Sequence, residues 1–82
     1  MYQHLIQVNP TYYMILADRF KSYFAIQNGK RWTVSSIDLQ ELFPEERILA
    51  THINKGEAIQ HIQKATKNWI QDRRAIYRRL VV

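Results

Sequence analysis

Three histidines are the residues of this chain with the most versatile chemistry, and two of them flank a carboxylate. His52 and His61 lie on either side of Glu57, while His4 stands near the N-terminus. Imidazole and carboxylate groups together can bind zinc or transfer protons. If residues 55–80 form a helix, however, His61 and Glu57 lie on its polar side. The chain has no Cys and no HExxH spacing, so we predict neither a metal site nor a cofactor.

The other residues that could support catalysis have ordinary structural roles. Glu45 and Glu46 follow Pro44, where adjacent carboxylates are typical of a turn or a helix start. Ser35 and Ser36 have no base nearby in the sequence and are typical of a helix cap. Only two glycines are present, too few for a glycine-rich phosphate cradle. We therefore predict that the protein is not an enzyme.

Charge is distributed very unevenly along the chain. Residues 55–82 carry seven Lys or Arg against two Asp or Glu, whereas residues 1–54 carry five of each. The whole net charge of +5 therefore belongs to the C-terminal third. A basic segment of this kind favours an acidic partner, such as nucleic acid or an acidic protein surface.

Helical spacing gathers this charge on one side of the C-terminal segment. At 100° per residue, four cations and two amides fall within an arc of about 80° that contains no acid. They are Gln60, Lys64, Lys67, Gln71, Arg74 and Arg78. The apolar stripe from Ile59 to Ile70 lies on another side and is typical of a core face. We predict a basic contact surface that also includes Arg79, and the alternative is an ordinary solvated face.

The predicted helix is longer than the domain that carries it. Residues 55–80 span about 39 Å as a helix, whereas a domain of this size is about 30 Å across. The last two turns should therefore extend past the domain, and they carry three large apolar side chains: Ile76, Tyr77 and Leu80. Either a protein partner or a second copy covers this apolar end, or residues 1–8 pack against it.

Residues 11–27 fit two structures. As a helix starting at about residue 10, they give an all-α fold; as two strands, they match the β-forming residues of the sequence YYMILA and SYFAIQ. The following Asn28-Gly29 pair favours a hairpin. A two-residue loop at this pair places Gln27 opposite Lys30. One apolar face of the hairpin then holds Tyr23, Ala25, Trp32 and Val34.

The remaining segments complete an α+β domain. Ser35 and Asp38 resemble a capping box and predict a short helical turn over 36–42. A strand follows near 47–53, and Asn54 then caps the long helix at about 55–80. We thus expect a single domain, residues 1–82, in which a small antiparallel sheet packs on one long C-terminal helix.

Two functions remain open for this domain. The first is a small adaptor or regulatory subunit that docks on a larger or acidic protein, or on a second copy, through the basic, apolar-ended helix. The second is nucleic-acid binding by the same helix face. No apolar run approaches the length of a membrane span. The absence of Cys suits a reducing compartment, so we expect a cytoplasmic protein.

Overall fold

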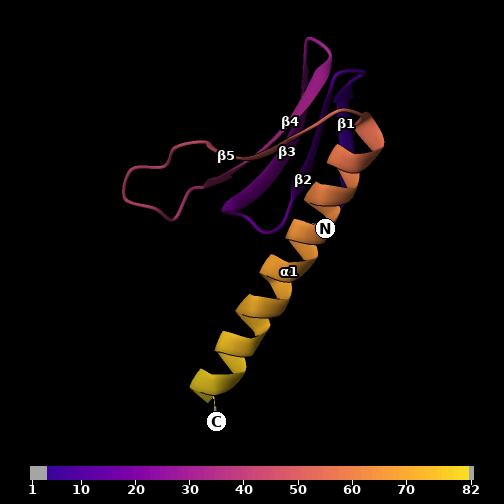
Figure 1. Cartoon of the computed structure of the whole chain (residues 1–82). Coiled ribbons are helices and arrows are strands. Elements are labelled where there is room, and N and C mark those ends of the chain that lie inside the picture. The colour runs from indigo at the N-terminus through magenta and orange to yellow at the C-terminus, as the bar shows by residue number, and fades with distance from the viewer. Residues whose placement is uncertain (1–3, 82) are drawn as a thin grey trace.

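The computed structural model combines one antiparallel sheet with one long helix, which confirms the predicted α+β class (Figure 1). It describes residues 4–81, with side chains described as far as residue 76. The strands lie side by side in chain order, so each pairs with the one before it. The elements are β1 (Leu5–Asn9), β2 (Tyr12–Leu16), β3 (Lys21–Asn28), β4 (Arg31–Asp38), β5 (Arg47–His52) and α1 (Lys55–Val81).

Residues 11–27 form two strands, β2 and β3, so the all-α alternative with a helix at about 10–27 is wrong. A strand directs alternate side chains to opposite faces of the sheet. Tyr13 and Ile15 are buried on the face that α1 covers, whereas Tyr12 and Met14 lie on the opposite face and are only partly buried. Both faces of the sheet are thus apolar along β2. Because apolar residues then occupy consecutive positions, the same sequence also satisfies the spacing of an amphipathic helix.

The turn between β2 and β3 is built on one carboxylate. Oδ1 of Asp18 accepts hydrogen bonds from the backbone N–H groups of Phe20 and Lys21, both at 2.8 Å. An aspartate that bonds the backbone two and three residues ahead stabilises a turn and competes with a continuing helix. The sequence position of Asp18 therefore decides where β2 ends.

The hairpin between β3 and β4 forms at the predicted Asn-Gly pair, but the predicted register is wrong. Asn28 pairs with Arg31, so the two residues at the turn are Gly29 and Lys30. Gly29 has a φ of 68° at the first of these positions, where the primed hairpin turns require positive φ. Each residue of β3 pairs with a residue of β4 two positions further along than predicted. Because side chains alternate between the two faces of a sheet, a shift of two leaves every side chain on its predicted face. The four residues predicted for the apolar face all lie in the core: Tyr23, Ala25, Trp32 and Val34.

The helical turn predicted over 36–42 is wrong, because β4 continues through Ser35 and Ser36 to Asp38. Both serines are buried within the strand rather than capping a helix. The hydroxyl of Ser35 donates a hydrogen bond of 2.6 Å to Oε1 of Glu46, eleven residues away. This tertiary contact satisfies the polar side chain that sequence spacing had assigned to a cap.

The long helix begins and packs as the sequence predicts. The backbone N–H of Glu57 donates to Oδ1 of Asn54 at 2.8 Å, which is the predicted N-cap. Ala58, Ile62 and Thr66 are buried against the sheet. The hydroxyl of Thr66 donates to the carbonyl of Ile62 at 2.7 Å, so its polar atom is satisfied inside the core. Three further side chains on this side are partly buried against the core: Ile59, Ala65 and Trp69.

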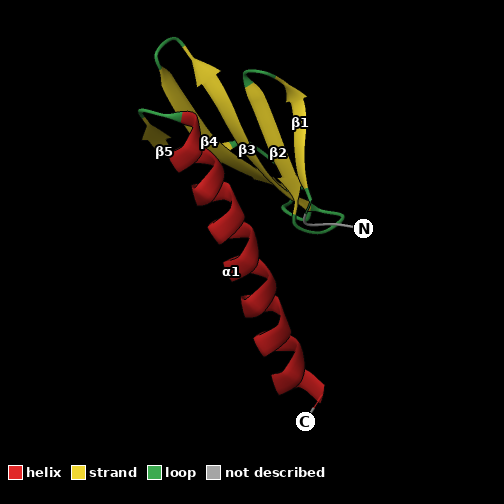
Figure 2. Ribbon diagram, turned by 90° about the vertical axis from the view of Figure 1, so that its right-hand side faces the viewer, coloured by secondary structure: helices red, strands yellow, loops and turns green. Residues whose placement is uncertain are grey.

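The helix covers only one face of the sheet and then leaves it. Figure 2 shows α1 starting beside β5, passing in front of the strands and ending well away from them. The principal extents are 48 × 26 × 21 Å, so the molecule is elongated by its helix. The sheet therefore fixes the first part of α1, while the last part projects as the sequence predicts.

Candidate docking surface on the C-terminal helix

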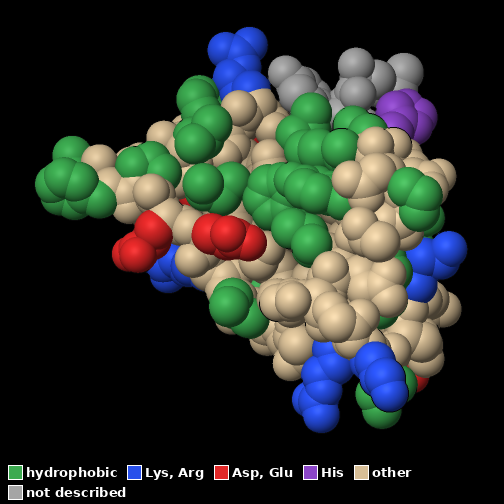
Figure 3. Space-filling view, turned by 90° about the horizontal axis from the view of Figure 1, so that it is seen from above, with side chains coloured by type: hydrophobic (Ala, Val, Ile, Leu, Met, Phe, Trp, Pro, Cys, Tyr) green, Lys and Arg blue, Asp and Glu red, His purple; other side chains and the backbone are tan. Residues whose placement is uncertain are grey.

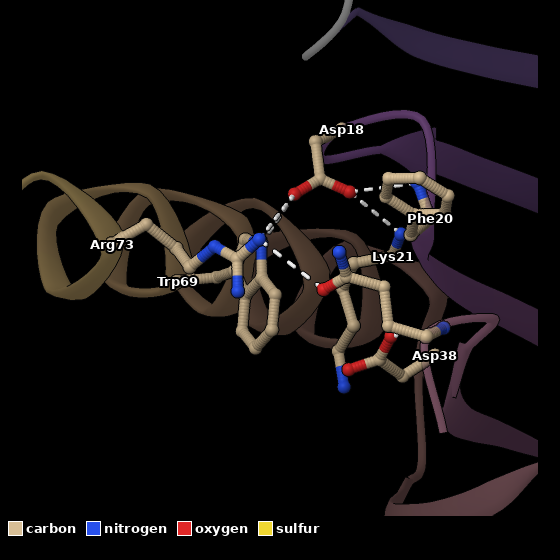
Figure 4. Close-up of polar contacts among 7 residues, drawn as sticks. Asp18, Phe20, Lys21, Asp38, Trp69 and Arg73 are labelled. Atoms are coloured by element: carbon tan, nitrogen blue, oxygen red, sulfur yellow. Dashed lines mark hydrogen bonds and ion pairs between the residues drawn. The ribbon is translucent and has the colours of Figure 1, made fainter. Parts of the chain in front are cut away.

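The anchor that fixes the course of α1 joins the helix to the turn between β2 and β3. Nε1 of Trp69 donates a hydrogen bond of 3.3 Å to Oδ2 of Asp18, across 51 residues of sequence (Figure 4). One turn further along the helix, a guanidinium nitrogen of Arg73 lies 3.9 Å from the same oxygen and donates to Oε1 of Gln40 at 3.2 Å. These contacts define the last point at which α1 is held against the sheet among the described side chains.

Two cations enclose the indole of this anchor. Nζ of Lys21 lies 4.9 Å from the ring centroid of Trp69, and the guanidinium carbon of Arg73 lies 5.0 Å from it. Cation–π contacts at these distances add to the hydrogen bond and the ion pair. Arg73, which interrupts the apolar side of the helix in sequence, is thereby explained as a structural residue.

The electrostatics of Asp18 favour its charged form. Burial by itself raises the pKa of the Asp18 carboxyl. The N–H groups of Phe20, Lys21 and Trp69, together with the charge of Arg73, outweigh burial and lower the pKa from 3.8. The carboxylate is therefore ionised at neutral pH and holds the turn and the helix together.

The predicted basic strip lies on the solvent side of α1 over its described part. Gln60, Lys64, Lys67, Gln71 and Arg74 are all exposed. Among the side chains that the structure describes, Lys64, Lys67 and Arg74 take part in no ion pair. Like charges one or two turns apart repel each other mildly, so the helix alone gains nothing from this arrangement. A partner that carries negative charge would relieve it.

The apolar end of the helix starts where the anchor stops. Ile76 lies one turn beyond Arg73 and is 55% exposed, so neither the sheet nor the N-terminal residues 4–8 bury it. The backbone remains helical to Val81. The side chains of the other predicted contact residues lie outside the described set: Tyr77, Arg78, Arg79 and Leu80. Of the predicted contact residues, Lys64, Lys67 and Gln71 are thus exposed where α1 still runs along the sheet, and Arg74 and Ile76 are exposed where it projects.

A second cluster joins the end of β5 to the start of α1. Nε2 of His52 lies 2.8 Å from Nδ1 of His61, and Nδ1 of His52 lies 3.6 Å from a carboxylate oxygen of Glu57. The three groups form a chain rather than a ring around a common point. No set of three or more His, Asp or Glu within the described residues is arranged to hold a metal ion. The geometry instead supports transfer of a proton between neighbouring groups.

Sequence reasoning missed a third exposed feature, which we call the acidic loop, residues 38–46. It connects β4 to β5 and projects to one side of the sheet (Figure 1). Leu42 and Phe43 are 87% and 80% exposed there. Figure 3 shows hydrophobic side chains at this projecting end, with acidic side chains beside them. The sequence signal for this loop is its composition, because the nine residues contain four acids and no Lys or Arg. The acids are Asp38, Glu41, Glu45 and Glu46.

The face of the sheet opposite α1 is also apolar. Strand register places Ile6, Met14 and Phe24 in one row across it, which continues through the buried Ser35 to Ile48, and all four apolar residues are at least partly exposed. In Figure 3 hydrophobic side chains cover the middle of the visible surface. In β2 and β3, apolar residues occupy the positions that face α1 and also the positions in between. This pattern is the sequence signal that could have revealed the second apolar face.

Comparison with known proteins does not assign these surfaces. No family model matches the chain, and no curated protein or solved structure matches it significantly. None of the helical sequence within residues 4–81 combines the length and the apolar character needed to cross a bilayer.

Proposed function

We propose that the protein is a small, non-enzymatic docking subunit that binds an acidic protein surface through the projecting part of α1. One observation carries this proposal: beyond Arg73 the helix leaves the sheet, and both Arg74 and Ile76 are exposed on this part of it. A helix that only completes a core has no need of such an extension.

The composition of the exposed side of α1 and of its projecting end suits protein recognition. Lys64, Lys67 and Arg74 supply a positive rim that speeds association with an acidic surface. Ile76 supplies an apolar side chain that gains free energy when a partner removes it from water. Interfaces commonly combine an apolar centre with a charged rim. We propose the cytoplasm as the location, in keeping with the absence of Cys.

Affinity capture with charge-reversal variants tests the proposal. The immobilised chain is exposed to nuclease-treated lysate, alongside the double variant Lys67→Glu/Arg74→Glu and the control Lys30→Glu at the β3–β4 hairpin. We expect the wild type and the control to retain the same acidic protein and the double variant to lose it. Equal capture by all three proteins would refute docking through this helix, and no capture by any would refute a partner other than a second copy of the chain.

Nucleic acid is the competing ligand class, and the unpaired cations of the described strip favour it equally. Anisotropy titrations with single-stranded and duplex oligonucleotides separate the two. If four cations contact phosphates, the logarithm of the binding constant falls with the logarithm of salt concentration with a slope of about −3 to −4. Binding with that slope, lost in the double variant, would replace the protein partner by nucleic acid.

A further inference from the structure

Two exposed elements of this chain are complementary to each other. The acidic loop presents Leu42 and Phe43 at its tip, beside Glu45. The end of α1 presents Arg74 and, two residues further on and on another side of the helix, Ile76; its sequence continues with further arginines and apolar residues as far as Val82. Each element thus combines exposed apolar side chains with charge, and the two charges have opposite sign.

The charge of the acidic loop is only partly compensated by its own surroundings. A guanidinium nitrogen of Arg47 lies 3.0 Å from Glu41, and Ser35 donates to Glu46. Glu45 is exposed and hydrogen-bonds to no described residue. A basic partner would therefore find both negative charge and a large apolar tip on this loop.

The apolar tip of the acidic loop and the exposed Ile76 of α1 do not meet within one molecule. Arg73 contacts Gln40 at the start of the acidic loop, and the loop and the helix then diverge (Figure 1). Because α1 continues as a helix to Val81, it does not bend back toward Leu42 and Phe43. Both apolar ends stay exposed in the isolated chain, so their complementarity can be satisfied only between molecules.

We propose that the partner of the projecting helix is a second copy of this chain, with the end of α1 of each copy seated on the acidic loop of the other. This rests on the proposed docking function and names its partner. A twofold axis makes the two contacts identical, so the assembly closes as a dimer rather than growing into a filament. Each copy then covers the exposed apolar tip of the other.

A charge exchange between two copies tests the proposal. Sedimentation or light scattering at micromolar concentration should give a dimer, with twice the 9.9 kDa mass of one chain. Arg74→Glu and Glu45→Lys should each weaken the dimer at least about tenfold, because each homodimer then faces like charges. An equimolar mixture of the two variants should restore the dimer, since a mixed pair has opposite charges at both contacts.

Controls separate contact from misfolding. Leu42→Ser/Phe43→Ser should give a folded monomer, whereas Ile53→Ser should still dimerise, because Ile53 is equally exposed, at 81%, but lies next to the start of α1. Circular dichroism should show the same helix content in all variants. A monomeric wild type, or a mixture that does not regain the dimer, overturns the proposal.

The outcomes also distinguish this inference from the docking function on which it rests. A monomeric wild type that still captures an acidic protein through Lys67 and Arg74 would refute self-association and leave docking intact. A monomeric wild type that captures no protein would refute both. A dimer that Leu42→Ser/Phe43→Ser leaves unchanged would place the interface elsewhere, most simply on the open face of the sheet, and would refute the exchange of helix and loop.

Discussion

Nε2 of His52 lies 2.8 Å from Nδ1 of His61, and this hydrogen bond ties the end of β5 to the second turn of α1. Only one proton can lie between these two nitrogens. Nδ1 of His52 faces a carboxylate oxygen of Glu57 at 3.6 Å. A second proton, on Nδ1 of His61, would direct two N–H groups at each other and break the contact.

This contact predicts that stability decreases in mildly acidic solution. Burial, followed by the charges of His52 and Lys64, lowers the pKa of His61 from 6.5. The unfolded chain then binds more protons than the folded chain as pH falls below 6.5. The stabilising contribution of neutral His61 is therefore complete above pH 6.5 and is lost as pH falls through its lowered pKa.

Urea unfolding at a series of pH values between about 5 and 8 measures this effect. We compare the wild type with His61→Gln, which retains hydrogen-bonding capacity but does not titrate. The free energy of unfolding of the wild type should fall more steeply toward acid than that of the variant. Parallel curves would show that His61 does not contribute to the pH dependence.

The anchor on Asp18 predicts a second stability effect. Asp18→Asn keeps the shape of the side chain but removes the charge that holds Arg73 and strengthens the bonds from Phe20, Lys21 and Trp69. We expect the free energy of unfolding to fall by about 1–2 kcal/mol, as for a charge-assisted hydrogen bond. The matched control Asp72→Asn, on the exposed side of α1, should change it by less than about 0.5 kcal/mol.

Denaturant unfolding monitored by tryptophan fluorescence gives both values. Trp69 lies in the anchor, so its emission also reports on local changes there. Equal losses in the two variants would mean that general charge, rather than the contact geometry of Asp18, is responsible.

Two isoleucines on the same helix test where α1 leaves the sheet. Ile62 is completely buried in the core, whereas Ile76 is 55% exposed. Ile62→Ala should cost about 2–5 kcal/mol through lost burial and an unfilled cavity. Ile76→Ala should cost less than about 0.5 kcal/mol when unfolding is measured at a concentration too low for the proposed dimer to form. A large cost at Ile76 would indicate that the helix end packs against the domain.

Gly29 provides a test of backbone strain without steric conflict. Its φ of 68° lies in the left-handed region, and a Cβ atom placed there meets no heavy atom within 4 Å. Gly29→Ala should therefore cost about 1–2 kcal/mol from the backbone alone. Gly29→Asn should cost less, because asparagine adopts positive φ more readily. If the two variants lose the same free energy in urea unfolding, strain at φ is not the cause.

Local sequence signals predicted most elements whose determinants lie within a few residues. Asn54 and Glu57 are three residues apart, and their N-cap forms as expected. The exposed strip at Lys64, Lys67, Gln71 and Arg74 follows directly from helical spacing once the helix exists. A helix repeats the same geometry at every residue, so its faces can be predicted from sequence alone.

Signals that depend on distant partners gave wrong or incomplete predictions. Ser35 resembles a cap, but its hydroxyl bonds to Glu46 from within β4. The hairpin register shifted by two residues because Gly29, rather than Asn28, takes the first turn position. Neither the exposure of Leu42 and Phe43 nor the apolar row on the open sheet face was predicted, since exposure depends on what the folded chain leaves uncovered.

The sequence by itself determined that a neutral segment precedes a basic amphipathic helix, because charge and helical periodicity are properties of consecutive residues. The tertiary structure alone decided that Trp69 and Arg73 meet Asp18 and that α1 leaves the sheet just after this contact. That contact spans about fifty residues. Packing and hydrogen bonding in the folded chain, rather than local conformational preference, select such a distant partner.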